Sequence, residues 1–123
     1  MEACMKTILV VDDDKMNLNN ALKILSPTYK VVPVPGGKVA LNYLQKGKPD
    51  LILLDVLMPD MDGFAVMEQL QANPDYADIP VIFLTADERE EVKNKGLALG
   101  AKGFMGKPLV AEEMLAGIAA VLG

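Results

Sequence analysis

The stretch Leu51-Ile52-Leu53-Leu54-Asp55 decides the fold, because four apolar residues in a row end in a carboxylate. A strand that is apolar on both faces is typical of the centre of a parallel sheet covered by helices on each side. Four further runs have the length and composition of strands: Thr7–Val11, Tyr29–Val34, Val81–Leu84 and the weaker, glycine-rich Gly103–Gly106. The sequence therefore predicts five strands, with Leu51–Leu54 near the centre.

Segments with helical spacing lie between and after these strands. Asp14 and Asp62 suit helix N-cap positions, and Gly100 suits a C-cap. The last two helices are expected over Asp87–Leu99 and Ala111–Leu122. The apolar residues that form the expected buried faces are Leu18, Leu22 and Leu25; Ala40, Leu41 and Leu44; Val66, Met67 and Leu70; Val92, Gly96 and Leu99; and Leu115, Ile118 and Leu122.

Five β-α repeats with short connections predict a doubly wound α/β domain, in which five helices cover both faces of a five-stranded parallel sheet. Pro33 interrupts the run Tyr29–Val34, and a proline that cannot donate a hydrogen bond to the sheet belongs on an edge strand. The strand order 2-1-3-4-5 places this run at an edge and Leu51–Leu54 at the centre, so it satisfies both observations.

Composition narrows the class of protein. A chain of 123 residues, 51% of them hydrophobic, is expected to form a single domain over residues 1–123. Its net charge of −5 argues against direct binding to nucleic acid or to an anionic membrane. No apolar run approaches the ~20 residues of a membrane helix, and the single cysteine, Cys4, indicates a reducing cytoplasm. The absence of histidine removes the usual ligands of zinc and the base of a Ser-His triad.

Three carboxylates follow two of the predicted strands, and such strand ends meet at the ligand-binding edge of a parallel sheet. Asp12 and Asp13 follow the first strand, and Asp55 follows the central one. Unit charges ~4 Å apart repel by several kcal/mol near a protein surface, so the three are stable together mainly with a cation among them. Oxygen ligands and an incomplete protein shell favour Mg²⁺ or Mn²⁺. Without Asp55, a solvated acidic turn would be the simpler interpretation.

Asp55 is the natural nucleophile of such a site, because a fixed carboxylate can attack a phosphoryl group and form an acyl phosphate. A bound cation would neutralise and align the phosphoryl oxygens. The loop after Asp55 leaves the backbone carbonyl of Leu57 free to ligate the metal. Alone, Asp55 would be read as a turn residue at the end of a strand.

Thr85 and Lys107 follow the other two strands that lead to this edge. The Thr85 hydroxyl suits a phosphoryl oxygen, and the alternative is that Thr85 only caps the helix Asp87–Leu99. The Lys107 ammonium would balance a phosphoryl charge, and the alternative is an ordinary surface lysine. The Lys107-Pro108 bond is a candidate cis peptide.

Four motifs occur in order along the chain: Val10-Val11-Asp12-Asp13, Asp55-Val56-Leu57-Met58-Pro59-Asp60-Met61-Asp62-Gly63, Leu84-Thr85-Ala86 and Lys107-Pro108. Any one of them is weak, but the ordered set is specific. Over essentially the whole chain, they resemble the receiver domain of two-component response regulators. The resemblance implies a flavodoxin-like fold with the strand order given above.

By this resemblance, Asp55 accepts a phosphoryl group from a phosphohistidine on a sensor histidine kinase or a histidine phosphotransfer protein. The domain would catalyse only its own phosphorylation and dephosphorylation, and would not be an enzyme for other substrates. The resemblance implies that Thr85 and Lys107 hold the phosphoryl group. It implies as Mg²⁺ ligands the residues Asp13 directly, Asp12 mostly through water, Asp55 and the Leu57 carbonyl.

Phe104 stands where the family often has tyrosine. In the family this aromatic side chain swings inward as the threonine hydroxyl moves toward the phosphate, so the resemblance implies a switch built from Thr85 and Phe104. The changing surface would comprise Asp87–Leu99, Gly103–Gly106 and Ala111–Leu122, and would act on a downstream effector or output domain. Because phenylalanine lacks the hydroxyl, contacts that depend on a tyrosine there are not expected.

Three rival interpretations differ in chemistry. A flavodoxin-like FMN binder would need a phosphate-binding loop after the first strand, where this chain has three aspartates. A phosphatase of haloacid-dehalogenase type also uses Asp, Thr, Lys and Mg²⁺, but its nucleophile follows the first strand in a DxDx[TV] pattern, and Asp12-Asp13-Asp14-Lys15-Met16 lacks the final Thr or Val. A receiver that has lost its reactivity is disfavoured, because every reactive position is occupied.

The last helix has no polar side chain from Met114 to Gly123. A helix that is apolar all round is normally buried, so the small-residue face through Ala116, Ala119 and Ala120 is a candidate contact surface for a homodimer or an output domain. The alternative is that these alanines are simply exposed.

Overall fold

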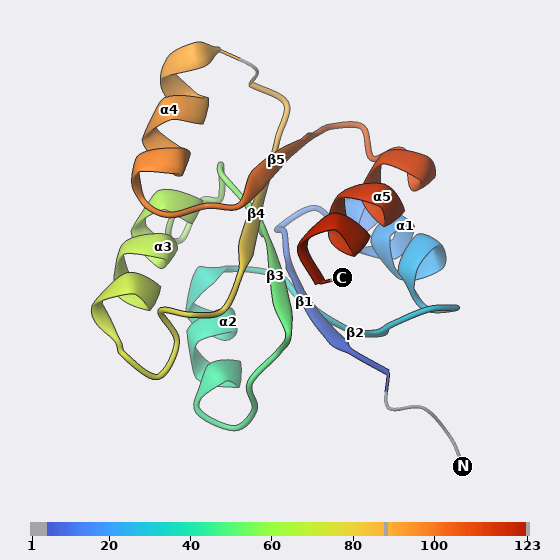
Figure 1. The fold of residues 1–123 in the computed structure, drawn as a ribbon, viewed down its shortest axis with the longest axis horizontal. Helices are drawn as coiled ribbons and strands as arrows, with labels where there is room; N and C mark the ends of the chain where they lie inside the picture. Colours follow the sequence, from blue (N-terminus) through green and yellow to red (C-terminus); the bar gives the residue numbers. More distant parts are fainter. Residues whose placement is uncertain (1–4, 88, 123) are drawn as a thin grey trace.

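The structure is a computed structural model that describes residues 5–87 and 89–122. Five parallel strands form one sheet in the order β2-β1-β3-β4-β5, as the sequence predicts (Figure 1). Cys4, the residue from which a reducing cytoplasm is predicted, lies outside the described residues. The strands are β1 (Thr7–Val11), β2 (Lys30–Val34), β3 (Leu51–Asp55), β4 (Val81–Thr85) and β5 (Gly103–Gly106).

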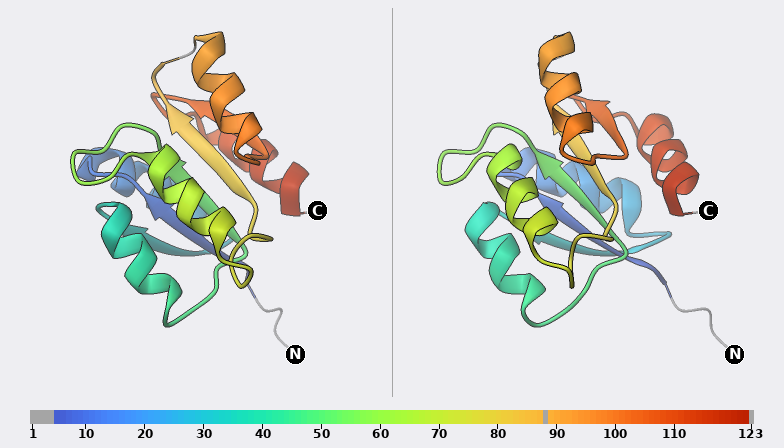
Figure 2. Two further views of the ribbon diagram at one scale, coloured as in Figure 1. Left: turned by 90° about the vertical axis from the view of Figure 1, so that its left-hand side faces the viewer. Right: turned by 60° about the vertical axis from the view of Figure 1, so that its left-hand side comes forward.

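Helices cover both faces of the sheet. In Figures 1 and 2, α2, α3 and α4 lie on one side of the sheet, and α1 and α5 lie on the other. Such a doubly wound α/β sandwich agrees with the predicted fold class. The helices are α1 (Lys15–Leu25), α2 (Gly37–Leu44), α3 (Gly63–Ala72), α4 (Glu90–Ala98) and α5 (Ala111–Leu122).

The core is split by the sheet into two apolar clusters. Alternate residues of each central strand face opposite ways, so Leu53 of β3 packs with the α1 and α5 side and Leu54 with the α2 and α3 side. All five residues of β3 and of β4 are buried. The apolar run that begins at Leu51 therefore forms the predicted central strand.

The β2 edge accommodates its proline as predicted. Pro33 pairs with Val10 of β1 along one side of β2, and no other strand in the described part of the chain lies beside β2. The missing N–H of Pro33 costs little at such an edge.

β3 and β4 each end one residue later than predicted, at Asp55 and Thr85, and α4 ends at Ala98 rather than Leu99. The starts of two elements also differ from the prediction. Tyr29 lies before β2, because its N–H donates to the Leu25 carbonyl (2.8 Å) in the turn that closes α1. Helix α4 begins at Glu90 and not at Asp87. The Asp87 carboxylate accepts the Arg89 N–H (3.1 Å), which forms a turn ahead of the helix.

The predicted capping residues agree with the structure. The carboxylates of Asp14 and Asp62 accept N–H groups in the first turns of α1 and α3, each at 2.8 Å. Gly100 follows α4 with φ of +102°, the left-handed conformation that favours glycine after a helix. No helix within residues 5–87 and 89–122 has both the length and the apolar character needed to cross a bilayer.

The first turn of α3 packs against the end of β3 so closely that only glycine fits at position 63. A Cβ on Gly63 would overlap the Asp55 carbonyl oxygen and lie 3.0 Å from Val56 Cα, and both are backbone atoms that have no room to move. We expect Gly63→Ala to lower the free energy of unfolding by about 3 kcal/mol, as overpacking does. Urea unfolding measures this. Gly103→Ala is the control, because a Cβ there meets nothing within 4 Å; equal stability of the two variants would contradict the account.

Candidate functional site

The predicted site residues lie together at the carboxyl edge of the sheet. Asp12 follows β1, and its N–H donates to the Val34 carbonyl at the end of β2 (3.2 Å). Asp55 is the last residue of β3, and Thr85 is the last residue of β4. Lys107 follows β5, and its N–H donates to the Thr85 carbonyl (3.1 Å), which continues the β4–β5 pairing past the end of β5. The parallel register therefore brings four separate strand ends to one place.

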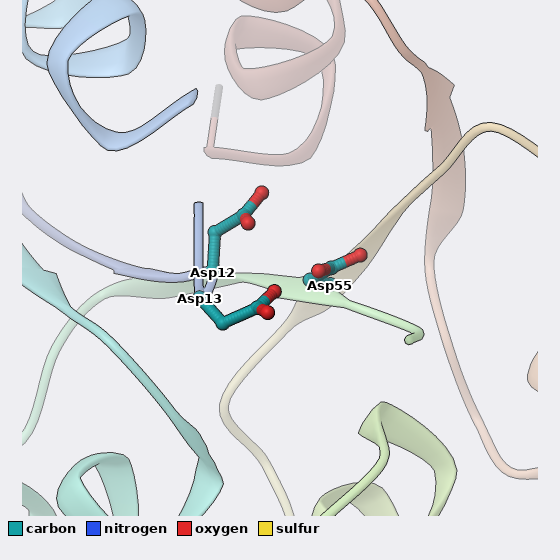
Figure 3. Close-up of side chains that lie close together, drawn as sticks. All are labelled: Asp12, Asp13 and Asp55. Carbon is teal, nitrogen blue, oxygen red and sulfur yellow. The ribbon is translucent and has the colours of Figure 1, made fainter. Parts of the chain in front are cut away.

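Three carboxylates converge at this edge. Asp12 and Asp13, from the end of β1, extend toward Asp55 at the end of β3 (Figure 3). One oxygen of each lies within 4.8 Å of the others, and Asp12 and Asp55 are buried while Asp13 is exposed. Asp13 thus opens the cluster to solvent, where a cation can enter.

Lys107 bridges the two buried carboxylates. Its Nζ lies 2.8 Å from Asp12 Oδ2 and 2.9 Å from Asp55 Oδ1, and its side chain is only 16% exposed. The surface-lysine alternative is therefore wrong for this residue. The Lys107-Pro108 peptide is cis, as the sequence suggested.

The pKa values of these groups reflect burial and mutual contact. Burial raises the pKa of Asp55, Lys107 lowers it, and the charges of Asp12 and Asp13 raise it again, to about 6 in all. Burial lowers the pKa of Lys107, but contact with Asp12 and Asp55 outweighs burial and leaves the pKa above its usual value. The ammonium therefore remains charged at neutral pH.

The residues present fit a hard cation such as Mg²⁺. Among the described residues, the buried Asp12 Oδ2 accepts no hydrogen bond. The Lys107 ammonium contacts this oxygen as a charge, 2.8 Å away, without the angles of a hydrogen bond. Three carboxylates against one ammonium leave two uncompensated negative charges, and oxygen donors are those that Mg²⁺ prefers. The cluster can therefore hold a metal ion.

Thr85 does not cap a helix. Its hydroxyl oxygen is buried and accepts the Asp87 N–H (2.9 Å) in a turn that precedes α4. The capping alternative for Thr85 is therefore wrong, because α4 starts only at Glu90. Asp87 itself pairs with the Arg89 guanidinium (2.7 Å), which lowers the pKa of Asp87.

Phe104 is half-buried on the α4 side of β5. Its ring stacks on Phe83 with centroids 5.7 Å apart and lies over Gly96 of α4, where a Cβ would collide with the ring. The alternative of a strand residue packed in the core therefore describes this structure, and a role in switching remains a prediction.

The sequence analysis missed a contact of Asp60. This residue of the β3–α3 loop accepts the Lys38 N–H (3.3 Å) at the start of α2. The available signal was the pair Gly36-Gly37, which opens α2 without any side chain able to cap it.

The raised pKa of Asp55 predicts a pH-dependent stability difference in metal-free protein. Folded Asp55 titrates at about 6 and the unfolded group at 3.8, so the folded state binds more protons between these values. The Asp55 contribution to stability is therefore lost as pH rises from about 4 to 6. We expect Asp55→Asn to be more stable than wild type at pH 7.5, on the order of 2 kcal/mol, with a smaller gap at pH 4.5. Urea unfolding in chelator tests this, and a gap independent of pH would contradict it.

Comparison with known proteins agrees with the motifs. Residues 8–119 match the family model of the response regulator receiver domain. A Vibrio cholerae protein named "Probable cyclic di-GMP phosphodiesterase" is 41% identical over 103 residues, which are 84% of this chain and 23% of that protein. Response regulator MprA of Mycolicibacterium vanbaalenii is 38% identical over 116 residues, which are 94% of this chain and 49% of that protein.

The fold has close structural relatives as well. The chemotaxis protein CheY4 of Vibrio cholerae superposes with a TM-score of 0.92 at 32% identity, covering 97% of this chain and all of that one. The chain spans half or less of the two curated relatives above, so the phosphodiesterase name describes a longer protein, of which this chain matches one part.

Fold, motif order and family match agree with one another, and none of them supports a phosphatase of haloacid-dehalogenase type. The strand order 2-1-3-4-5 and the three aspartates at the carboxyl edge of the sheet agree with the family match. The chain belongs to the response regulator receiver domain family.

Proposed function

We propose that Asp55 is the phospho-acceptor of this receiver domain. The observation that carries the proposal is the Lys107 ammonium, which lies 2.9 Å from Asp55 Oδ1 beside a cluster of three carboxylates. Asp55 is the central member of the site, because it ends the central strand. The donor would be a phosphohistidine on a sensor histidine kinase or phosphotransfer protein.

In the proposed reaction, a carboxylate oxygen of Asp55 attacks phosphorus, and the bond from phosphorus to the donor's leaving atom breaks. The product is an acyl phosphate, and the leaving group departs with its electron pair. Mg²⁺ supplies charge neutralisation of the phosphoryl oxygens when it is bound. Its proposed ligands are Asp12 and Asp13 in the loop after β1, Asp55 at the end of β3, and the Leu57 carbonyl in the loop after β3.

Lys107 and Thr85 have separate roles in this proposal. Lys107 stays charged and moves from a carboxylate oxygen to a phosphoryl oxygen, so no buried charge is left unpaired. The Thr85 hydroxyl, which donates to the Asp87 carbonyl (3.4 Å) in this structure, would donate to a phosphoryl oxygen instead. That exchange would disturb the turn before α4, and Phe104 would follow by changing its packing against α4.

The surface formed by α4, β5 and α5 is proposed to change on phosphorylation and to carry the signal to the next protein or domain. Phosphorylation favours a minor conformation of this surface, which a downstream effector or a linked output domain recognises. We propose that residues 1–123 form a single receiver domain, which works in the cytoplasm and acts on no substrate other than itself.

Incubation with acetyl phosphate and Mg²⁺ tests the proposal. Intact-mass spectrometry should find one added phosphoryl group that is labile to hydroxylamine, and none when the metal is chelated. Turnover of general phosphoesters without a stable adduct would instead favour a phosphatase, and no reaction with saturating Mg²⁺ would reject the phospho-acceptor.

A homodimer through α5 stays a prediction. Ala116, Ala119 and Ala120 are exposed on this helix, and a groove of about 340 Å³ between β5 and α5 reaches Ala120. If phosphorylation drives two copies of the chain to pair through this helix, beryllofluoride, which mimics the phosphoryl group, should raise the sedimentation coefficient of wild type. It should not raise the sedimentation coefficient of Ala119→Glu. A protein that is monomeric in both states would eliminate the dimer.

A further inference from the structure

Helix α2 begins without a cap of its own. Its N-cap residue is Gly36, which has no side chain, and its first turn carries no acidic residue. The first N–H groups of a helix have no partner within the helix, and the N-terminus carries a partial positive charge. The acceptor for these N–H groups therefore comes from outside α2, either from water or from another part of the chain.

Asp60 supplies that acceptor from another part of the chain. Its Oδ2 accepts the Lys38 N–H at 3.3 Å, across 22 residues of sequence. The carboxylate also lies against Gly36, where a Cβ would be only 2.9 Å from Oδ2. Slight burial raises the pKa of Asp60, but hydrogen bonds from the backbone of Lys38, Met61 and Gly37 outweigh it and hold the pKa below its usual value.

Asp60 sits in the loop that joins β3 to α3, three residues after Leu57. Asp62 fixes the far end of this loop to α3, because its carboxylate accepts the Ala65 N–H (2.8 Å). The Gly63 N–H closes the loop onto the Val56 carbonyl (2.8 Å). Asp62 ties the loop to the helix that follows it, and Asp60 ties the same loop to its neighbour α2.

We propose that Asp60 is a positioning residue for the metal site, holding the 56–62 loop against α2 so that the Leu57 backbone carbonyl stays in place as a ligand. The inference rests on the proposed function for the identity of the metal and of this ligand. Asp60 would touch neither metal nor phosphoryl group, and would act only through the loop.

Four proteins separate this role from charge and from simple capping. Asp60→Ala removes the acceptor. Asp60→Asn keeps an acceptor oxygen but removes the charge. Asp60→Ala with Gly36→Ser gives α2 a cap of its own, in the space vacated by the carboxylate, without restoring the tie to the loop. Asp75→Ala removes an equal charge from the α3–β4 connection, which leads to the opposite edge of the sheet.

The readouts are Mg²⁺ affinity by calorimetry and the thermal midpoint in chelator. We expect Asp60→Ala to bind Mg²⁺ about tenfold more weakly, the usual loss when an outer partner of a metal ligand is removed. Asp60→Asn and Asp75→Ala should stay within about twofold of wild type. The double variant should regain the thermal midpoint of wild type while its Mg²⁺ affinity stays low.

Unchanged Mg²⁺ affinity in Asp60→Ala would overturn the inference, and so would recovery of Mg²⁺ affinity in the double variant, which would reduce Asp60 to a helix cap. Equal weakening in Asp60→Asn and Asp60→Ala would assign the effect to charge and also overturn it. If wild type binds no Mg²⁺, the proposed function fails first and the inference falls with it, so the two failures are distinguishable.

Discussion

Asp55→Asn should reduce phosphoryl incorporation from one group per molecule to none. The substitution removes the only carboxylate at the end of the central strand and retains its shape, so the fold should persist. Asparagine is a poor nucleophile toward phosphorus, and Asp12 is held beside Lys107 at the end of a different strand. Intact-mass spectrometry after treatment with acetyl phosphate and Mg²⁺ measures the change directly.

Asp50→Asn provides the control for this variant. Asp50 is exposed next to β3 at the opposite edge of the sheet, where its carboxylate accepts the Thr7 N–H. The same chemical change at Asp50 should leave incorporation intact. Residual phosphorylation of Asp55→Asn at the wild-type level would place the acceptor elsewhere.

Asp13→Ala should abolish measurable Mg²⁺ binding and, with it, metal-dependent phosphorylation. Asp13 is the exposed member of the carboxylate cluster, and among the described residues it makes no lysine contact, unlike Asp12 and Asp55. Removing a direct ligand from a site with so few protein ligands leaves mostly water around the ion. Calorimetric titration with Mg²⁺ gives the affinity, and circular dichroism checks the fold.

Asp14→Ala is the matched neighbour for this test. Asp14 caps α1 through the Met16 N–H (2.8 Å), so its loss should lower stability by about 1 kcal/mol and leave Mg²⁺ affinity nearly unchanged. Undiminished Mg²⁺ affinity in Asp13→Ala would count against the metal site as assigned.

The fold was predictable because the hydrophobic periodicity and the residues that begin or end helices and strands agreed along the chain. The apolar run ending at Leu54 could only be a central strand, and Pro33 could only lie at an edge. Boundaries were predicted less well where a local contact overrode the pattern. Tyr29 has strand character, but its N–H belongs to the end of α1, and Asp87 turns toward Arg89 before α4 can begin.

The site was predictable in its members but not in its contacts. Parallel strands bring their ends together, so Asp12, Asp55 and Lys107 could be grouped from sequence. That Lys107 bridges both carboxylates depends on side-chain geometry that no spacing encodes. The hydrogen bond from the first turn of α2 to Asp60 is a long-range contact. The only signal for it in the sequence is the pair of glycines at 36 and 37, which have no side chain to cap the helix.

Chemical trapping of the phosphorylated residue tests the central claim most directly. Borohydride reduces an acyl phosphate to an alcohol and leaves free carboxylates untouched, so peptide mass spectrometry reads out the acceptor. After treatment with acetyl phosphate and Mg²⁺, we predict homoserine at position 55 and unmodified aspartate at positions 12 and 13. Homoserine at position 12 or 13 with intact Asp55 would contradict the account.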